Sequence, residues 1–180
     1  TPVPVAELAV RSRVLRPGRS VELVEAELEA GDRVVVGAQG WRVREVELDL
    51  PPSDDEPAPG LPDASSAWPR SPGGYLNAME WRYVSGEPAI PGPATVWGRM
   101  RYPLVPGEEP TGLQRMLVLA DSGNGVSSVL PWTEWLFINP ELTVHVAAVP
   151  EGEWICLDAQ TRVDSHGFGL ASSRLFDRQR

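Results

Sequence analysis

The sequence predicts an α+β fold in which one helix is wrapped by an antiparallel sheet. Short apolar runs separated by turns containing Pro and Gly fill most of the 180 residues, a spacing typical of strands joined by hairpins. One segment, residues 111–120, instead repeats its apolar residues at helical intervals. A helix followed by successive strands is expected to pack against the sheet that those strands form.

Residues 1–50 are predicted to be the strand portion of an N-terminal unit. Turns are expected at Pro17-Gly18 and Gly31-Asp32, because Pro presets φ and Gly tolerates positive φ. The apolar spacing of Val21–Leu28 fits either a helix or a strand with a phase slip, and its Ala, Leu and Glu favour a helix. The hairpin-sized span between the turns favours a strand, and residues 34–44 are expected to form the next one.

Residues 51–74 are predicted to be a linker. Pro, Asp, Ser and Gly dominate this segment, as in Pro51–Pro57 and Pro59–Pro62. Such a composition buries too little apolar surface to offset the entropy of ordering the chain. The length also argues against a surface loop within one domain. The chain is therefore expected to consist of two units joined by an extended linker.

The second unit, residues 75–180, contains the predicted helix. Thr111 and Gln114 have capping-box spacing at its start, and the apolar residues that follow recur at i, i+3, i+4 and i+7 up to Ala120. Strands are predicted on both sides of the helix, at residues 78–84, 94–102, 135–149, 153–163 and 168–177.

Composition and charge exclude several classes of function. The net charge is −9, and the positive side chains are all arginines scattered among carboxylates, which argues against nucleic-acid binding. No apolar run approaches the ~20 residues that span a bilayer, and the start has no signal-peptide pattern. The single cysteine, Cys156, excludes an internal disulfide, favours a cytoplasmic protein, and is expected to be buried and unreactive.

The junction after the predicted helix is the best candidate for chemistry. The helix is expected to end on Asp121, and the next residues, Ser122–Gly125, are expected to turn rather than continue it. Partial burial would raise the pKa of Asp121 toward a value useful for a general base. The alternative is a structural aspartate that ties down the turn through a side-chain to backbone hydrogen bond.

Polar and aromatic residues near this junction are candidate substrate-binding residues. The polar ones could hydrogen-bond a substrate or serve as turn residues. The aromatic ones could line an acyl pocket or belong to an ordinary core or subunit interface. These candidates are Asn124, Ser127, Trp132, Trp135 and Phe137.

The stretch Met116–Pro131, with Leu136–His145 downstream, resembles the C-terminal half of double-hotdog acyl-CoA thioesterases, the type II thioesterase-like group of high-GC bacteria. The resemblance implies a double hotdog that hydrolyses acyl-CoA-type thioesters in lipid metabolism and assembles as a homo-oligomer. It further implies that Asp121 is the catalytic aspartate. The family's hydroxyl residue aligns with Phe137, which cannot hold a water, so Asn139 is the candidate to supply a polar group instead.

Other parts of the family's site are expected outside this chain. The resemblance places the helix of the first unit before Thr1, and a last strand with a catalytic glutamine after Arg180. Two alternatives to hydrolysis stay open. A non-catalytic acyl-CoA-binding or assembly module is favoured by Phe137. A hotdog dehydratase or hydratase would need a histidine near the helix, and neither His145 nor His166 is expected there.

Sequence motifs predict neither a cofactor nor a metal. The two histidines lack the spacing of metal ligands, and no Gly-x-Ser-x-Gly elbow indicates a serine hydrolase.

Overall fold

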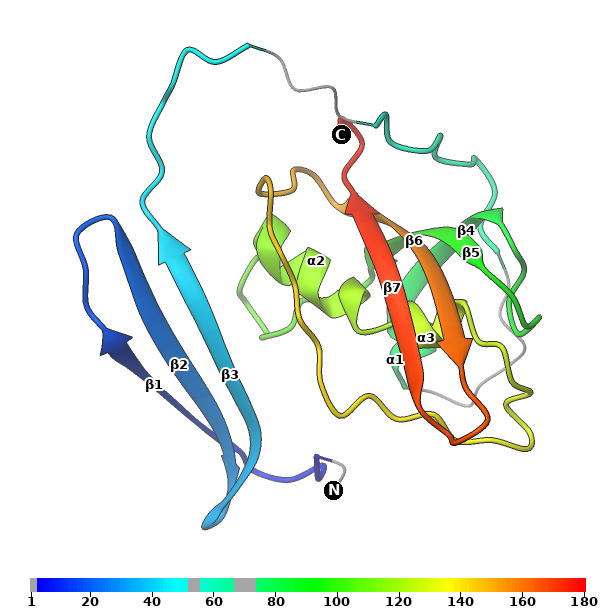
Figure 1. Ribbon diagram of the computed structural model, residues 1–180, viewed down its shortest axis with the longest axis horizontal. Helices are drawn as coiled ribbons and strands as arrows, with labels where there is room; N and C mark the ends of the chain where they lie inside the picture. The colour runs from blue at the N-terminus through cyan, green and yellow to red at the C-terminus, as the bar shows by residue number, and fades with distance from the viewer. Residues whose placement is uncertain (1–2, 52–55, 67–73) are drawn as a thin grey trace. The chain divides into compact units, whose positions relative to one another are not determined.

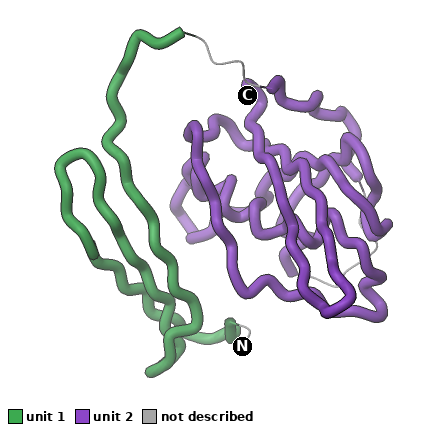
Figure 2. Tube along the Cα trace, viewed as in Figure 1, with its two compact units in different colours: residues 1–53 green, residues 54–180 purple. Residues whose placement is uncertain are grey.

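A computed structural model describes residues 3–51, 56–66 and 74–180, which belong to two compact units (Figure 1). Unit 1 comprises residues 1–53, and unit 2 comprises residues 54–180 (Figure 2). Each unit has its own antiparallel sheet, so among the described residues no strand of one unit pairs with a strand of the other.

Unit 1 contains a sheet of β1 (Ala9–Arg16), β2 (Val21–Ala30) and β3 (Arg33–Val43), in that order. β2 pairs with both neighbours along its length, which confirms the strand prediction for residues 21–28. The turn between β2 and β3 holds Gly31 at φ 63°, a conformation that Gly adopts without the penalty of a Cβ.

Unit 2 contains a sheet in the order β4-β5-β6-β7, and each neighbouring pair is antiparallel. The helices α2 and α3 lie between β5 and β6 in the sequence and α1 precedes β4 (Figure 1). The predicted helix and four of the five predicted strands are therefore confirmed. The bounds are α1 (Tyr75–Ala78), β4 (Met79–Ser85), β5 (Ala94–Met100), α2 (Gly112–Ala120), α3 (Gly123–Val126), β6 (Trp154–Val163) and β7 (Gly169–Phe176).

α2 begins with the predicted capping box. The Thr111 hydroxyl accepts a hydrogen bond from the Gln114 backbone N–H at 3.2 Å, and the Gln114 side chain accepts one from the Thr111 N–H at 2.7 Å. Two N–H groups that a helix start leaves unpaired are thereby satisfied. None of the helices among the described residues is long and apolar enough to cross a membrane.

The core of unit 2 lies between α2 and one face of its sheet. Leu119 is fully buried in a cluster with Val96 and Leu157 from the two central strands. Gly98 makes this close packing possible, because a Cβ there would lie 2.6 Å from Leu119 Cδ1. The absence of a side chain at Gly98 thus leaves room for Leu119 of α2 to pack directly on β5.

The opposite face of the sheet is covered by part of the predicted linker. Leu61 packs against the cluster of Trp97 and Trp154 on this face. At the sheet edge, the Ser66 N–H donates to the Trp81 carbonyl of β4 at 2.7 Å. Residues 56–66 form neither helix nor strand, but they are held against unit 2 and do not act as a free spacer. Residues 52–55 and 67–73 of the linker lie outside the described chain.

Cys156 lies in this covered face and is fully buried. Burial, with a smaller contribution from the nearby Asp158 carboxylate, raises the pKa of its thiol to about 12. The prediction of a buried cysteine is therefore confirmed, and a thiol that stays protonated is a poor nucleophile.

The predicted strand at residues 135–149 is wrong. This segment has no regular secondary structure, and no backbone hydrogen bond joins residues 136–149 to other described residues. Near its start, the Asn124 side chain donates to the Phe137 carbonyl at 3.1 Å. This backbone acceptor is therefore paired with a side chain instead of with a neighbouring strand. Pro140 then removes one backbone donor. Alternating apolar residues alone do not produce a strand here.

The glycine-rich turn expected after α2 is also wrong, because residues 123–126 form the short helix α3. Asp121 and Ser122 keep right-handed helical φ and ψ values, so the chain bends without reversing. Gly123 is suited to this place for a packing reason, since a Cβ there would lie 2.7 Å from the Ser173 hydroxyl on β7.

Candidate active site around Asp121

Asp121 is the C-cap residue of α2, as predicted. The residue is exposed rather than partly buried. The Asn139 side-chain amide donates to both the backbone carbonyl and Oδ1 of Asp121, at 3.0 Å and 3.1 Å. The two residues proposed from sequence as catalytic are therefore in direct contact, although 18 positions separate them.

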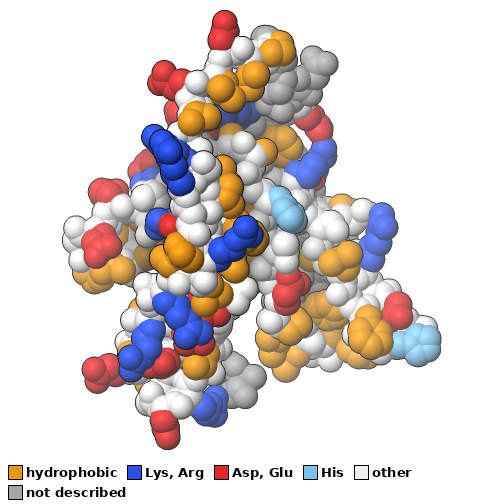
Figure 3. Space-filling model, turned by 60° about the vertical axis from the view of Figure 1, so that its left-hand side comes forward, with side chains coloured by type: hydrophobic (Ala, Val, Ile, Leu, Met, Phe, Trp, Pro, Cys, Tyr) orange, Lys and Arg blue, Asp and Glu red, His pale blue; other side chains and the backbone are white. Residues whose placement is uncertain are grey.

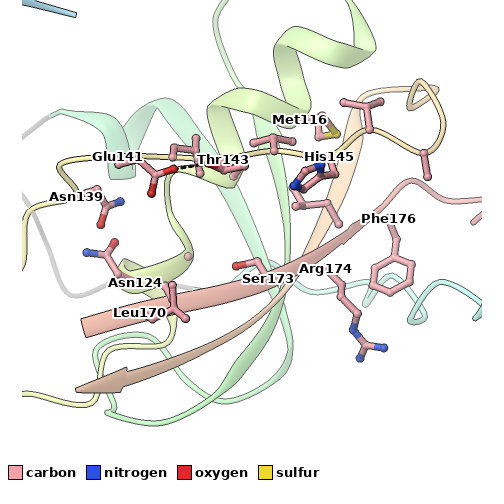
Figure 4. Close-up of a pocket in the computed structure, with 18 of the residues that line it drawn as sticks. Met116, Asn124, Asn139, Glu141, Thr143, His145, Leu170, Ser173, Arg174 and Phe176 are labelled. Atoms are coloured by element: carbon pink, nitrogen blue, oxygen red, sulfur yellow. Dashed lines mark hydrogen bonds between the residues drawn. The ribbon is translucent and has the colours of Figure 1, made fainter. Parts of the chain in front are cut away.

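A pocket of about 680 Å³ lies beside this pair, within unit 2. Its walls come from the C-terminal half of α2, the start of α3, the irregular segment 137–150, and β7. Asn139 and Asn124 are both in the lining, and their side chains point toward each other at one end of the pocket (Figure 4). Asp121 itself is not in the lining, but it contacts Asn139, which is.

The rest of the lining is mixed in character. Met116 and His145 lie together on one side, and Phe176 and Arg174 lie beyond Ser173 along β7 (Figure 4). His145 is exposed and lies on the irregular segment, so its expected place on a strand is wrong. These residues come from distant parts of the sequence, and no local spacing marked them as neighbours of Asn124.

Phe137 is the aromatic candidate that lines the pocket. Its ring lies against Gly169, where a Cβ would meet the ring at 2.1 Å, and it presents no hydroxyl at this position. Trp132 and Trp135 do not line the pocket, and they expose 54% and 57% of their surface. They stay predictions as substrate-binding residues.

Ser127 is placed away from the pocket and below the surface. It is fully buried, and its hydroxyl donates to the Gly123 carbonyl at 2.8 Å and lies 2.8 Å from the Thr161 hydroxyl. Both hydrogen-bonding roles of this hydroxyl are satisfied inside the protein. The geometry favours a structural role over the predicted contact with substrate.

The described residues offer no metal centre at the site. Within residues 3–51, 56–66 and 74–180, no group of three His, Cys, Asp or Glu side chains could hold a metal ion. Basic and acidic side chains are interspersed over the face shown in Figure 3. The site consists of the Asp121 carboxylate, the amides of Asn124 and Asn139, and a partly apolar pocket that also contains His145 and Arg174.

Fold and site together define an α+β protein with a carboxylate at the end of a helix that packs on a sheet. The family described as the acyl-CoA thioesterase C-terminal domain matches residues 49–180, and the acyl-CoA thioesterase N-terminal domain matches residues 1–43. The chain belongs to the acyl-CoA thioesterase family. No curated protein sequence matches the chain.

Three solved structures are similar to this chain. A protein from Thermobifida fusca YX, provisionally assigned as thioesterase II, has a TM-score of 0.61 and 17% identity, covering 94% of this chain and 66% of its own. The tesB protein of Mycobacterium avium subs paratuberculosis has a TM-score of 0.55 and 15% identity, covering 95% and 65%. Acyl-CoA thioesterase II TesB2 of Mycobacterium marinum has a TM-score of 0.50 and 17% identity, covering 95% and 68%.

At these identities the likeness concerns the fold, and it confirms the predicted α+β double hotdog. The chain spans just under two thirds of the length of the first two structures.

Proposed function

We propose that the chain carries part of a site that hydrolyses acyl-CoA-type thioesters to a free acid and a thiol. The observation that carries the proposal is the contact between Asn139 and Asp121 at the edge of the pocket. Membership of the acyl-CoA thioesterase family supports this reaction over others that a carboxylate can assist. The expected homo-oligomer, the cytoplasmic location and a role in lipid metabolism are part of the same proposal.

The carboxylate of Asp121 acts as the general base. The Asn139 amide holds Oδ1, and among the described residues no donor contacts Oδ2, which is left to accept a hydrogen bond from water. Asp121 takes a proton as the water oxygen attacks the thioester carbonyl carbon. The C–S bond then breaks, and the proton passes from Asp121 to the departing thiolate.

The pocket holds the acyl group. Its volume of about 680 Å³ is within the range of small-molecule sites. Met116, Phe137 and Leu170 give it apolar wall, whereas Asn124 and Asn139 place amides at the end nearest Asp121. The reacting carbonyl is therefore expected at the amide end, with the acyl chain directed toward Met116.

The test is acyl-CoA hydrolysis by the full-length protein and its Asp121→Asn variant. Loss of the base is expected to lower kcat by at least about a hundredfold, while acyl-CoA binding, measured by calorimetry, persists. Glu109→Gln is the matched control, because it makes the same carboxylate-to-amide change on a side chain that is 95% exposed. Equal turnover by Asp121→Asn and wild type would refute the assignment.

A second candidate function is non-catalytic acyl-CoA binding, and Phe137 favours it. The ring occupies the pocket wall at the position where the family resemblance calls for a hydroxyl. The Asn124 amide already donates to the Phe137 carbonyl, so this donor is not directed at a substrate. This candidate predicts micromolar acyl-CoA binding with no turnover of any chain length. Measurable hydrolysis that Asp121→Asn abolishes would exclude it.

A further inference from the structure

We propose that Tyr75 is a positioning residue for Asp121. It acts through its contacts with the last turn of α2 and with Ser122, the residue that follows Asp121. The inference rests on the proposed role of Asp121 as the base. Nothing in the sequence pattern pairs the two, since Tyr75 lies 43 residues before the α2 residue that its hydroxyl contacts.

The Tyr75 hydroxyl reaches both sides of Asp121. It donates to the Val118 carbonyl in the last turn of α2 at 3.0 Å, and it lies 2.7 Å from the hydroxyl of Ser122. Asp121 is the residue immediately before Ser122 and three after Val118. One phenol group thus joins the end of the helix to the first residue beyond the carboxylate.

The Val118 carbonyl needs this partner because the last turn of α2 is tightened. In a regular α-helix the Ser122 N–H would donate to Val118. Here it donates to the Leu119 carbonyl at 2.9 Å instead. Tyr75 therefore satisfies an acceptor that the tightened turn leaves open, and this tightening is what sets the direction of the backbone at Asp121.

Tyr75 is 42% exposed, and its ring is packed against Trp81. Its ring meets the ring of Trp81 edge-on, with centroids 6.0 Å apart and an interplanar angle of 79°. Trp81 is 3% exposed and donates through its indole N–H to the Leu76 carbonyl in α1 at 3.1 Å. The phenol hydroxyl is therefore fixed relative to the sheet, because Trp81 belongs to β4.

The pKa of the phenol is also raised. Removal of the hydroxyl from water raises the pKa of Tyr75 to about 12, and the negative charge of Asp121 acts in the same direction, whereas the hydrogen bond with Ser122 opposes them. Below that pH the hydroxyl keeps its proton and can donate to Val118. Asn139 thus contacts Asp121 directly, whereas Tyr75 holds Val118 and Ser122, which precede and follow it.

The test is the Tyr75→Phe variant of the full-length protein, which keeps the ring and its contact with Trp81 but removes the hydroxyl. We expect kcat for acyl-CoA hydrolysis to fall about tenfold with KM changed less than about twofold, because a misplaced base affects the chemical step more than binding. Tyr102→Phe is the matched control. Tyr102 is 66% exposed and has no hydrogen bond to the described residues. The kcat of the Tyr102→Phe variant is therefore expected to equal that of the wild type.

A double-variant cycle separates positioning from simple stabilisation. If Tyr75 acts through Asp121, Tyr75→Phe has no further effect on turnover in the Asp121→Asn background. An unchanged kcat in Tyr75→Phe, or an equal loss in both backgrounds, would overturn the inference while leaving Asp121 as the base. Full activity of Asp121→Asn alone would instead overturn the proposed function. Should Tyr75→Phe fail to fold, Ser122→Ala carries the same test and is expected to lower kcat in the same direction.

Discussion

At the scale of single residues, the carboxylate of Glu80 makes the sharpest prediction about stability. Glu80 is 7% exposed, on the sheet face away from α2, and accepts hydrogen bonds from Arg99 at 2.6 Å and Arg82 at 2.9 Å. The hydrogen bond from Arg99 is the main cause that lowers the pKa of Glu80 to about 2, with Arg82 and Ser65 adding to it against the opposing effect of burial.

A lowered folded-state pKa stabilises the protein above the ordinary pKa of 4.5, and this contribution is lost as the pH falls toward 2. Glu80→Gln is therefore expected to lower the free energy of unfolding by about 2–3 kcal/mol at pH 7, with the difference from wild type shrinking below pH 4.5. Urea unfolding at pH 7 and pH 3 measures it. Glu153→Gln is the control, because Glu153 is 65% exposed at the same Arg99. A constant difference at both pH values would contradict the assignment.

Ser127 makes the second prediction at this scale. Its replacement by Ala leaves the Gly123 carbonyl and the Thr161 hydroxyl without their buried partner. We expect Ser127→Ala to cost about 1–2 kcal/mol in unfolding free energy with KM for acyl-CoA unchanged, whereas exposed Ser172→Ala changes neither. A severalfold rise in KM at unchanged stability would restore the substrate-binding role that the sequence suggested.

Single residues differ in how far the sequence could predict their roles. The resemblance to a family singled out Asp121 and Asn139, which the structure brings into contact, whereas their catalytic roles stay predictions. Asn124 was singled out by its place in the glycine-rich stretch, and it lines the pocket. The exposure of Asp121 was not predictable, because its burial depends on the path of residues 137–150. Asn139 in this segment contacts Asp121, but the segment does not cover the carboxylate. Tyr75 was missed because its contacts arise only once β4 and α2 are packed together.

At the scale of elements, the start of α2 depends on a glycine. Ala is a better helix former than Gly by about 1 kcal/mol, yet a Cβ at Gly112 would lie 1.8 Å from the Pro150 carbonyl oxygen. Backbone must move to relieve this clash. We therefore expect Gly112→Ala to destabilise the protein by about 2 kcal/mol in thermal or urea unfolding.

The matched control for this prediction is Gly60→Ala, because no atom lies within 4 Å of a Cβ at Gly60. The Gly60→Ala variant is expected to have the same unfolding midpoint as the wild type or a slightly higher one. If Gly112→Ala proved more stable than wild type, helix propensity would outweigh the packing of α2 against Pro150, and the described contact would be wrong.

Elements were predictable where local chemistry decides the structure. The capping box of Thr111 and Gln114 is a local signal, and so are the turns that bound β2. Residues 135–149 have equally good strand alternation but form no ladder, because pairing depends on a free partner edge and on which backbone groups side chains such as Asn124 already occupy. Tertiary context, rather than propensity, decided that segment.

At the scale of the whole molecule, the sequence predicted a two-unit chain with a double-hotdog fold, and the similar structures confirm the fold. It could not predict that residues 56–66 pack on the sheet of unit 2, because their Pro-rich composition has no periodicity. Ala58 and Leu61 pack against the buried cluster of Trp97 and Trp154, and Ser65 and Ser66 add hydrogen bonds to β4.

The central claim is that an exposed helix-end carboxylate, held by Asn139, hydrolyses acyl thioesters beside the pocket of unit 2. The most direct measurement is the initial rate of hydrolysis of a short-to-long acyl-CoA panel by the full-length protein, alongside Asp121→Asn and Glu109→Gln. We predict turnover by wild type and Glu109→Gln, and loss of turnover with retained acyl-CoA binding in Asp121→Asn. No turnover at any chain length, or turnover unaffected by Asp121→Asn, would contradict the claim.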